Sequence, residues 1–154
     1  MTLPRSLTPR ATYRLQFHAG FGFKDAAAIA PYLHRLGISH VYASPYLKAR
    51  PGSTHGYDIT DHQALNPELG TEVDFIAMVR EFQREGLGQI LDFVPNHMGV
   101  GGSDNALWLD VLEWGPDVPK RASGLPTLTG CISSLKCKNM AFVLVWSSGG
   151  LEGT

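Results

Sequence analysis

The chain has 154 residues, of which 44% are apolar, enough for one globular domain with a hydrophobic core. Thirteen Lys and Arg residues nearly balance 14 Asp and Glu, and this net charge of −1 excludes a nucleic-acid binder that works through bulk positive charge. No apolar run reaches the roughly 18 residues of a membrane span, no signal segment is visible, and two cysteines make no disulfide framework, so we expect a cytoplasmic protein without nucleic-acid or membrane partners.

The first predicted elements are a strand, a helix and a second strand. Residues 11–17 alternate in polarity, which predicts a strand with one face formed by Tyr13, Leu15 and Phe17. Residues 25–36 predict an amphipathic helix with an apolar stripe of Ile29, Tyr32, Leu33 and Leu36. Pro31 predicts a kink or a late start, and Gly37 predicts the end of this helix. Residues 38–43 predict the second strand.

The next unit repeats this order. Thr71 and Asp74 form a capping signal, and the helix that follows has a stripe of Phe75, Met78, Val79 and Phe82. Gly86 predicts its end, residues 89–94 predict a strand buried on both faces, and residues 105–113 predict a third helix. The order β-α-β-α-β-α predicts an α/β fold with parallel strands.

Two architectures fit this order, a doubly wound open sheet and a TIM (β/α)8 barrel. The segment 44–70 favours the barrel, because it follows a strand and is crowded with aromatic, acidic and histidine side chains. We expect it to be a long functional loop without secondary structure of its own. Since a whole barrel needs roughly 250 residues, the expected fold is an incomplete TIM barrel of about the first three β/α units.

The composition changes near residue 119. Residues 1–118 carry 9 basic and 13 acidic side chains, a sum of −4, whereas residues 119–154 carry 4 and 1, a sum of +3. Within this tail only residues 141–146 predict a strand. We therefore expect a domain over 1–118 and a tail over 119–154. The tail is interpreted either as a variable linker with one strand or as an unmatched segment, frameshifted or disordered.

The end of the third predicted strand carries the strongest chemical signal, Asp92-Phe93-Val94-Pro95-Asn96-His97. Strand alternation places Asp92 on the face opposite Phe93, and an ionised carboxylate in an apolar strand is costly unless it is paired. Asp92 therefore either meets a cation from a neighbouring strand, lines a polar site, or caps the next turn as a structural residue.

A second cluster is His55-Gly56-Tyr57-Asp58. Tyr57 offers a flat apolar face with a polar tip, which suits a sugar-binding platform, although one anchoring tyrosine in a polar loop is also an ordinary structural feature. Several side chains could ligate a metal, but their spacing matches no zinc template: Asp58, Asp61, His62, Asp92 and His97. Dinucleotide, phosphate-loop and nucleophile-elbow motifs are absent.

Together these motifs resemble the N-terminal part of the catalytic barrel of glycoside hydrolase family 13, the α-amylase family. The resemblance rests on Tyr57-Asp58, Asp61, Asn66-Pro67, Gly70-Thr71 and Asp92-x-x-x-Asn96-His97. Four further segments are similar to the subgroup of this family that forms maltooligosyltrehalose: Tyr13–Phe17, Tyr42–Pro45, Ala49–Asp58 and Asn96–Met98. The resemblance extends from about residue 11 to about residue 116.

The resemblance implies roles for six residues. Tyr57 corresponds to an aromatic that stacks on the sugar in the cleavage subsite, and His97 to a histidine that hydrogen-bonds this sugar. His55 and Asp58 correspond to neighbouring substrate-binding positions, the role of Asp58 being unassigned. Asp92 and Asn96 are implied to support the site, Asp92 by orienting its neighbours and not as the nucleophile.

The implied reaction is an isomerisation. A maltooligosaccharide would have its reducing-end α-1,4 linkage converted to α,α-1,1 by intramolecular transglucosylation, as part of trehalose biosynthesis. Retention requires two carboxyl groups roughly 5–5.5 Å apart. In the family both come from the second half of the barrel, so we expect no catalytic residue, metal or cofactor here and an inactive fragment. The alternatives are an α-glucan hydrolase of the same family and a stand-alone carbohydrate-binding protein.

Overall fold

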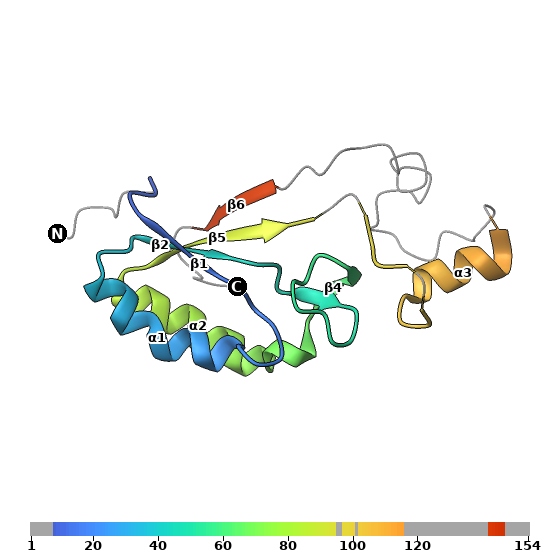
Figure 1. Cartoon of the computed structure of the whole chain (residues 1–154), viewed down its shortest axis with the longest axis horizontal. Helices are drawn as coiled ribbons and strands as arrows, with labels where there is room; N and C mark the ends of the chain where they lie inside the picture. The colour runs from blue at the N-terminus through green and yellow to red at the C-terminus, as the bar shows by residue number, and fades with distance from the viewer. Residues whose placement is uncertain (1–7, 95–96, 101, 116–141, 147–154) are drawn as a thin grey trace, which may run out of the picture.

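Three parallel strands and two helices form the core of the computed structural model, which describes residues 8–94, 97–100 and 102–115 and the backbone of 142–146. The sheet has the order β1-β2-β5-β6. Its strands are β1 (Thr12–Leu15), β2 (His40–Ala43), β5 (Gly88–Phe93) and β6 (Phe142–Trp146). Helices α1 (Phe23–Arg35) and α2 (Glu72–Glu85) lie side by side against one face (Figure 1). The predicted α/β order with parallel β1, β2 and β5 is confirmed.

The apolar face of α1 differs from the predicted stripe. The residues that are buried are Phe23, Ala26, Ala30 and Leu33, whereas Tyr32 and Leu36 are 53% and 51% exposed. The helix also begins at Phe23, so the prediction of a late start was wrong. Small alanines let α1 approach its neighbours closely, and a stripe chosen by side-chain size alone misses this face.

Helix α2 follows its sequence signals. Thr71 accepts a hydrogen bond from the backbone N–H of Asp74, whose carboxylate accepts one from the backbone N–H of Thr71, so the predicted capping box is present. Met78 and Phe82 are buried, and Gly86 ends the helix in the left-handed conformation with φ of 78°.

The long segment after β2 has secondary structure, so the expectation of an unstructured loop was wrong. Strands β3 (Leu47–Ala49) and β4 (Ile59–Leu65) pair antiparallel, and a short 3-10 helix η1 (Pro67–Leu69) follows. The backbone N–H of Asn66 donates to the carbonyl of Tyr46, and this hydrogen bond joins the two ends of the segment. The hairpin lies at the carboxyl end of the parallel strands (Figure 1).

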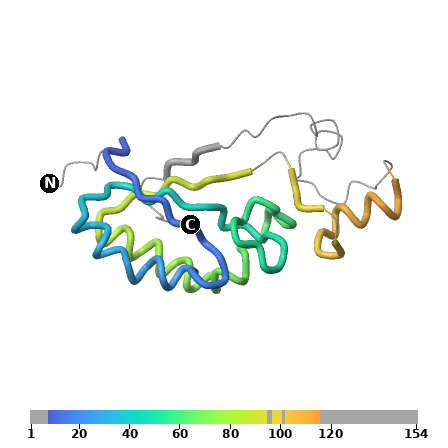
Figure 2. The backbone as a smooth tube through the Cα atoms, in the orientation of Figure 1, coloured from blue at the N-terminus to red at the C-terminus, as the bar shows by residue number. Residues whose placement is uncertain are grey.

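Helix α3 (Ala106–Trp114) is the predicted third helix, and none of its residues is buried. In Figure 2, α3 lies apart in space from α1 and α2. None of the helices in the described ranges is long and apolar enough to cross a membrane.

The predicted strand in the tail is present as β6, which pairs antiparallel with β5 from Gln89↔Trp146 to Phe93↔Phe142. Residues 119–141 and 147–154 of the tail lie outside the described residues, so the boundary at 119 stays a prediction.

Strand β5 is fully buried on one face only. Ile90 and Asp92 on that face are buried, while Gln89, Leu91 and Phe93 on the other face are half-buried.

Candidate functional site

The candidate site lies on the face of the sheet opposite α1 and α2. Leu15, Val41 and Leu91 point toward the helix-covered core, so strand alternation turns Arg14, Tyr42 and Asp92 to the other side. Arg14 and Tyr42 are register partners on β1 and β2, which brings one cation and one hydroxyl beside the buried carboxylate of β5.

Three donors converge on one oxygen of Asp92, whose side chain is only 5% exposed. Oδ2 accepts hydrogen bonds from the hydroxyl of Tyr57 at 2.5 Å, the hydroxyl of Tyr42 at 3.0 Å and Nη1 of Arg14 at 3.4 Å. The other oxygen, Oδ1, is buried and has no hydrogen-bond partner among the described residues. The carboxylate is thus fixed from one side and keeps an unused acceptor on the other.

The surroundings of Asp92 keep both tyrosines protonated. Burial and the hydrogen bond to Asp92 raise the pKa of the Tyr57 hydroxyl, and the same two causes raise the pKa of Tyr42. Burial acts to lower the pKa of Arg14, but its contacts with Tyr57, Tyr42 and Asp92 outweigh this and raise it. At neutral pH Arg14 is therefore a cation and both tyrosines are neutral hydroxyl donors, with Arg14 also 4.7 Å from the ring centre of Tyr42.

A tight turn between β3 and β4 presents Tyr57 to this cluster. Gly56 has φ of 75°, and a Cβ atom there would lie 3.2 Å from the carbonyl oxygen of Pro45. His55 stacks on Tyr57 with ring centres 5.8 Å apart and planes 21° apart. The pair forms a flat aromatic platform beside the carboxylate, a shape that suits a sugar ring.

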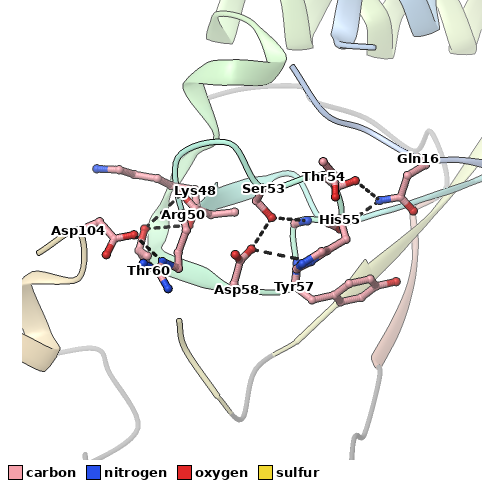
Figure 3. Close-up of polar contacts among 12 residues, drawn as sticks. Gln16, Lys48, Arg50, Ser53, Thr54, His55, Tyr57, Asp58, Thr60 and Asp104 are labelled. Atoms are coloured by element: carbon pink, nitrogen blue, oxygen red, sulfur yellow. Dashed lines mark hydrogen bonds and ion pairs between the residues drawn. The ribbon is translucent and has the colours of Figure 1, made fainter. Parts of the chain in front are cut away.

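Asp58 contacts residues of the turn and not the ring of Tyr57. Its carboxylate accepts a hydrogen bond from the hydroxyl of Ser53 and lies 3.9 Å from Nδ1 of His55. Figure 3 shows Asp58 directed back into the turn while the ring of Tyr57 points outward. The contacts of Asp58 thus hold the turn together, and a direct role in substrate binding stays a prediction.

The structure brings His55, Tyr57 and Asp92 together, but not all six candidates. His97 is exposed and has no hydrogen bond or ion pair within the described part of the chain. Asn96 lies outside the described residues. The predicted convergence of Tyr57, Asp92 and His97 around one sugar is therefore supported for the first two and stays a prediction for His97.

The segment that follows His97 is anchored to the β3–β4 hairpin. The backbone N–H of Gly99 donates to the carbonyl of Ile59 at 2.7 Å, and Nε of Arg50 lies 3.0 Å from Oδ2 of Asp104. A Cβ atom at Gly99 would lie 2.8 Å from the carbonyl oxygen of Asp58, so the two segments approach closely there.

The candidate metal ligands do not gather. Across the described ranges no three or more His, Cys, Asp or Glu side chains lie close enough to hold an ion. His62, for example, has its Nε2 3.1 Å from the carbonyl oxygen of Val94.

Comparison with known proteins agrees with this arrangement. Residues 28–110 match the family model described as "Alpha amylase, catalytic domain". The chain belongs to the α-amylase catalytic-domain family. The matched residues include β2, the hairpin with Tyr57, and β5 with Asp92.

Similar proteins narrow the comparison within this family. A Mycobacterium tuberculosis protein assigned as a maltooligosyl trehalose synthase is 45% identical over 111 residues, which are 68% of this chain and 14% of that protein. The solved structure of maltooligosyltrehalose synthase from Arthrobacter ramosus is 43% identical, with a TM-score of 0.69, over 71% of this chain and 15% of that one. The Bacteroides thetaiotaomicron α-amylase SusG is 40% identical over 84 residues, 53% of this chain and 12% of that protein.

The predicted resemblance is thereby confirmed, including the incomplete barrel: the chain spans about 14% of the length of the two Mycobacterium tuberculosis relatives. Sequence reasoning missed two members of the cluster, Arg14 and Tyr42. Both lie in short segments that the resemblance had used, but a polar residue in a strand of alternating polarity is ordinary, so no local signal singled out Arg14.

Proposed function

We propose that this chain forms part of the sugar-binding subsite of an enzyme that converts the reducing-end α-1,4 linkage of maltooligosaccharides to α,α-1,1 by intramolecular transglucosylation. The observation that carries the proposal is the stacked pair His55 and Tyr57 beside Asp92, whose Oδ1 is a buried acceptor without a partner. An apolar platform and a fixed carboxylate are what a pyranose needs, because its ring faces are apolar and its hydroxyls donate.

In this function Asp92 is an orienting group. A retaining reaction uses two carboxyl groups roughly 5–5.5 Å apart, and no second carboxylate contacts Arg14, Tyr42 or Tyr57 among the described residues. We infer that the nucleophile and the acid are supplied by other parts of a longer enzyme, and that this segment binds and orients the glucose residue.

The trehalose-forming reaction is preferred over hydrolysis on sequence similarity. Relatives named as trehalose-forming synthases are 43–46% identical over 68–74% of the chain, whereas the α-amylases and glucosidases in the comparison with curated proteins match 51–73% of it at 34–46% identity. A role in trehalose biosynthesis in the cytoplasm follows from this preference and is part of the proposal.

A chimera tests the proposal. Residues 11–115 would replace the corresponding segment of the Arthrobacter ramosus maltooligosyltrehalose synthase, and the products from maltopentaose would be separated by chromatography. We expect a non-reducing product, so that reducing ends disappear without release of free glucose. Release of glucose and maltotetraose as the main products would instead favour the hydrolase.

Two variants of the chimera connect the result to the site. Tyr57→Ala removes the platform and should lower kcat/KM by about tenfold or more, since one aromatic stacking contact with a sugar is lost. Tyr13→Ala is the matched control, because Tyr13 is 42% exposed at the start of β1 and makes no contact with the Asp92 cluster. Equal losses in the two variants would contradict the assigned site.

A further inference from the structure

We infer that Arg14 and Gln16 are positioning residues that hold the Tyr57 turn against Asp92, an arrangement called here the β1 clamp. The inference rests on the proposed sugar-binding function for its purpose, but its geometry stands on the contacts alone. Neither residue was among the candidates derived from sequence.

Arg14 bridges the two polar groups of the site. One guanidinium nitrogen, Nη2, donates to the hydroxyl oxygen of Tyr57 at 2.8 Å, while the other, Nη1, lies 3.4 Å from Oδ2 of Asp92. The hydroxyl of Tyr57 in turn donates to the same Oδ2. The three groups form a closed triangle of hydrogen bonds, which fixes the position of the Tyr57 hydroxyl.

Gln16 holds the backbone of the same turn. Its Nε2 donates to the carbonyl oxygens of Thr54 at 3.3 Å and His55 at 3.2 Å, and its Oε1 accepts from Nη2 of Arg14 at 3.2 Å (Figure 3 shows the contacts with Thr54 and His55). Because Arg14 and Gln16 are two residues apart on an extended segment, both side chains leave the same face. Arg14 and Gln16 together thus contact the hydroxyl of Tyr57 and the backbone of the turn.

The bridge requires an arginine. A guanidinium presents several N–H groups in a planar fork, so it can meet two acceptors at once and stack on the ring of Tyr42, whereas a lysine ammonium is a single point of charge. If the clamp acts through geometry, Arg14→Lys should resemble Arg14→Gln; if only the positive charge matters, Arg14→Lys should resemble the unmodified chain.

The clamp also explains why Asp92 keeps one free oxygen. All its internal donors approach Oδ2, and Oδ1 is left without a partner in the described residues. A carboxylate held on one oxygen presents the other in a fixed direction. The ligand class that fits the cluster is a neutral polyhydroxyl compound that stacks on Tyr57.

The experiment uses the whole 154-residue chain with 13C at the ζ carbon of tyrosine. Its first measurement is the alkaline titration of the Tyr57 signal, assigned with Tyr57→Phe. Arg14 acts to lower the pKa of the Tyr57 hydroxyl, so Arg14→Gln should move the titration midpoint upward. The Tyr46 signal, from a buried core ring, should stay unchanged and reports that the fold is intact. Arg80→Gln, at an exposed site on α2, is the matched control.

The second measurement is the affinity for maltopentaose, followed by the same signals. We expect binding to weaken about fivefold or more in Arg14→Gln and in Arg14→Lys, and to be unchanged in Arg80→Gln. An unchanged Tyr57 midpoint in Arg14→Gln, or full rescue of affinity by Arg14→Lys, overturns the clamp. A shifted midpoint in a chain that binds no maltopentaose supports the clamp and contradicts the proposed sugar-binding role of this chain.

Discussion

The hydroxyl oxygen of Tyr57 lies 2.5 Å from Oδ2 of Asp92, although 35 residues separate the two along the chain. The contact joins the turn of a β-hairpin to the end of the third parallel strand, and Arg14 joins both to the first strand. Three separate segments of sequence therefore meet at a single carboxylate oxygen, which makes that carboxylate important for folding as well as for the proposed binding.

Exchanging Asp92 for alanine should lower the free energy of unfolding by about 1–3 kcal/mol, because its removal leaves the partly buried donors of Tyr42 and Tyr57 without an acceptor. Asp92→Asn keeps one acceptor oxygen and should cost less. Urea titration monitored by circular dichroism measures both. Glu113→Gln, an exposed carboxylate-to-amide exchange on α3, is expected to change stability little, and a loss equal to that of Asp92→Asn would count against the cluster.

Gly56 and Gly52 offer a paired test of close backbone approach in the Tyr57 turn. Both have φ of 75°, but a Cβ atom at Gly56 meets the carbonyl oxygen of Pro45 at 3.2 Å, whereas at Gly52 it meets nothing within 4 Å. Alanine at either position should cost about 1–2 kcal/mol for the left-handed backbone. Gly56→Ala should cost more than Gly52→Ala in thermal unfolding, and equal costs would show that the turn relaxes without strain.

Asn105 is expected to anchor α3 and the segment before it. Its Oδ1 accepts from the backbone N–H of Trp108 at 3.1 Å, and its Nδ2 donates to the carbonyl of Gly99 at 2.8 Å. Asn105→Asp keeps the helix cap and loses the second bond, while Asn105→Ala loses both and should cost about 1–2 kcal/mol. Amide hydrogen exchange should show faster opening near Gly99 in both variants but faster opening of the first turn of α3 only in Asn105→Ala.

The stability should fall as the pH falls through the range of histidine titration. Burial, with a smaller effect of Arg10, lowers the pKa of His40 in the folded chain below its ordinary value of 6.5. The unfolded chain then binds a proton more readily than the folded one, so stability rises with pH across the interval between the two pKa values and is lost as the pH falls below about 6.5. His40→Gln should flatten this dependence in urea titrations between pH 5 and 8, and an unchanged pH dependence would contradict the assignment to His40.

The elements of this fold were predictable where local signals were strong. Thr71 with Asp74 marks the start of α2, Gly86 marks its end, and Asn105 precedes α3. Such capping signals can be recognised in the sequence because a cap contacts residues only three or four positions away. The face of α1 was not predictable from side-chain size, since Ala26 and Ala30 become buried only through tertiary packing. The hairpin in the segment 44–70 was also missed, because β3 is short and its pairing with β4 is irregular.

The residues of the candidate site also divide into those that the sequence predicts and those that it does not. Asp92 could be identified from the sequence because an acid in an apolar strand is costly unless it is paired, whereas Tyr57 received its predicted role from the family resemblance. The role of Arg14 can be recognised only in the folded chain, where β1 lies beside β2 and the turn folds back over both. Its partners Tyr57 and Asp92 are 43 and 78 positions away along the sequence. Asp58 contacts Ser53 within the turn, and its predicted role in substrate binding stays a prediction.

The antiparallel pairing of β6 has a consequence for how this sheet can grow. All strands of a (β/α)8 barrel run in one direction, yet the row of backbone donors and acceptors along the outer side of β5 is already used by a strand of opposite direction. A further parallel strand and β6 would compete for these backbone groups, and only one of them can pair with β5 at a time. A barrel could therefore close from this edge only after Phe142–Trp146 had separated from β5.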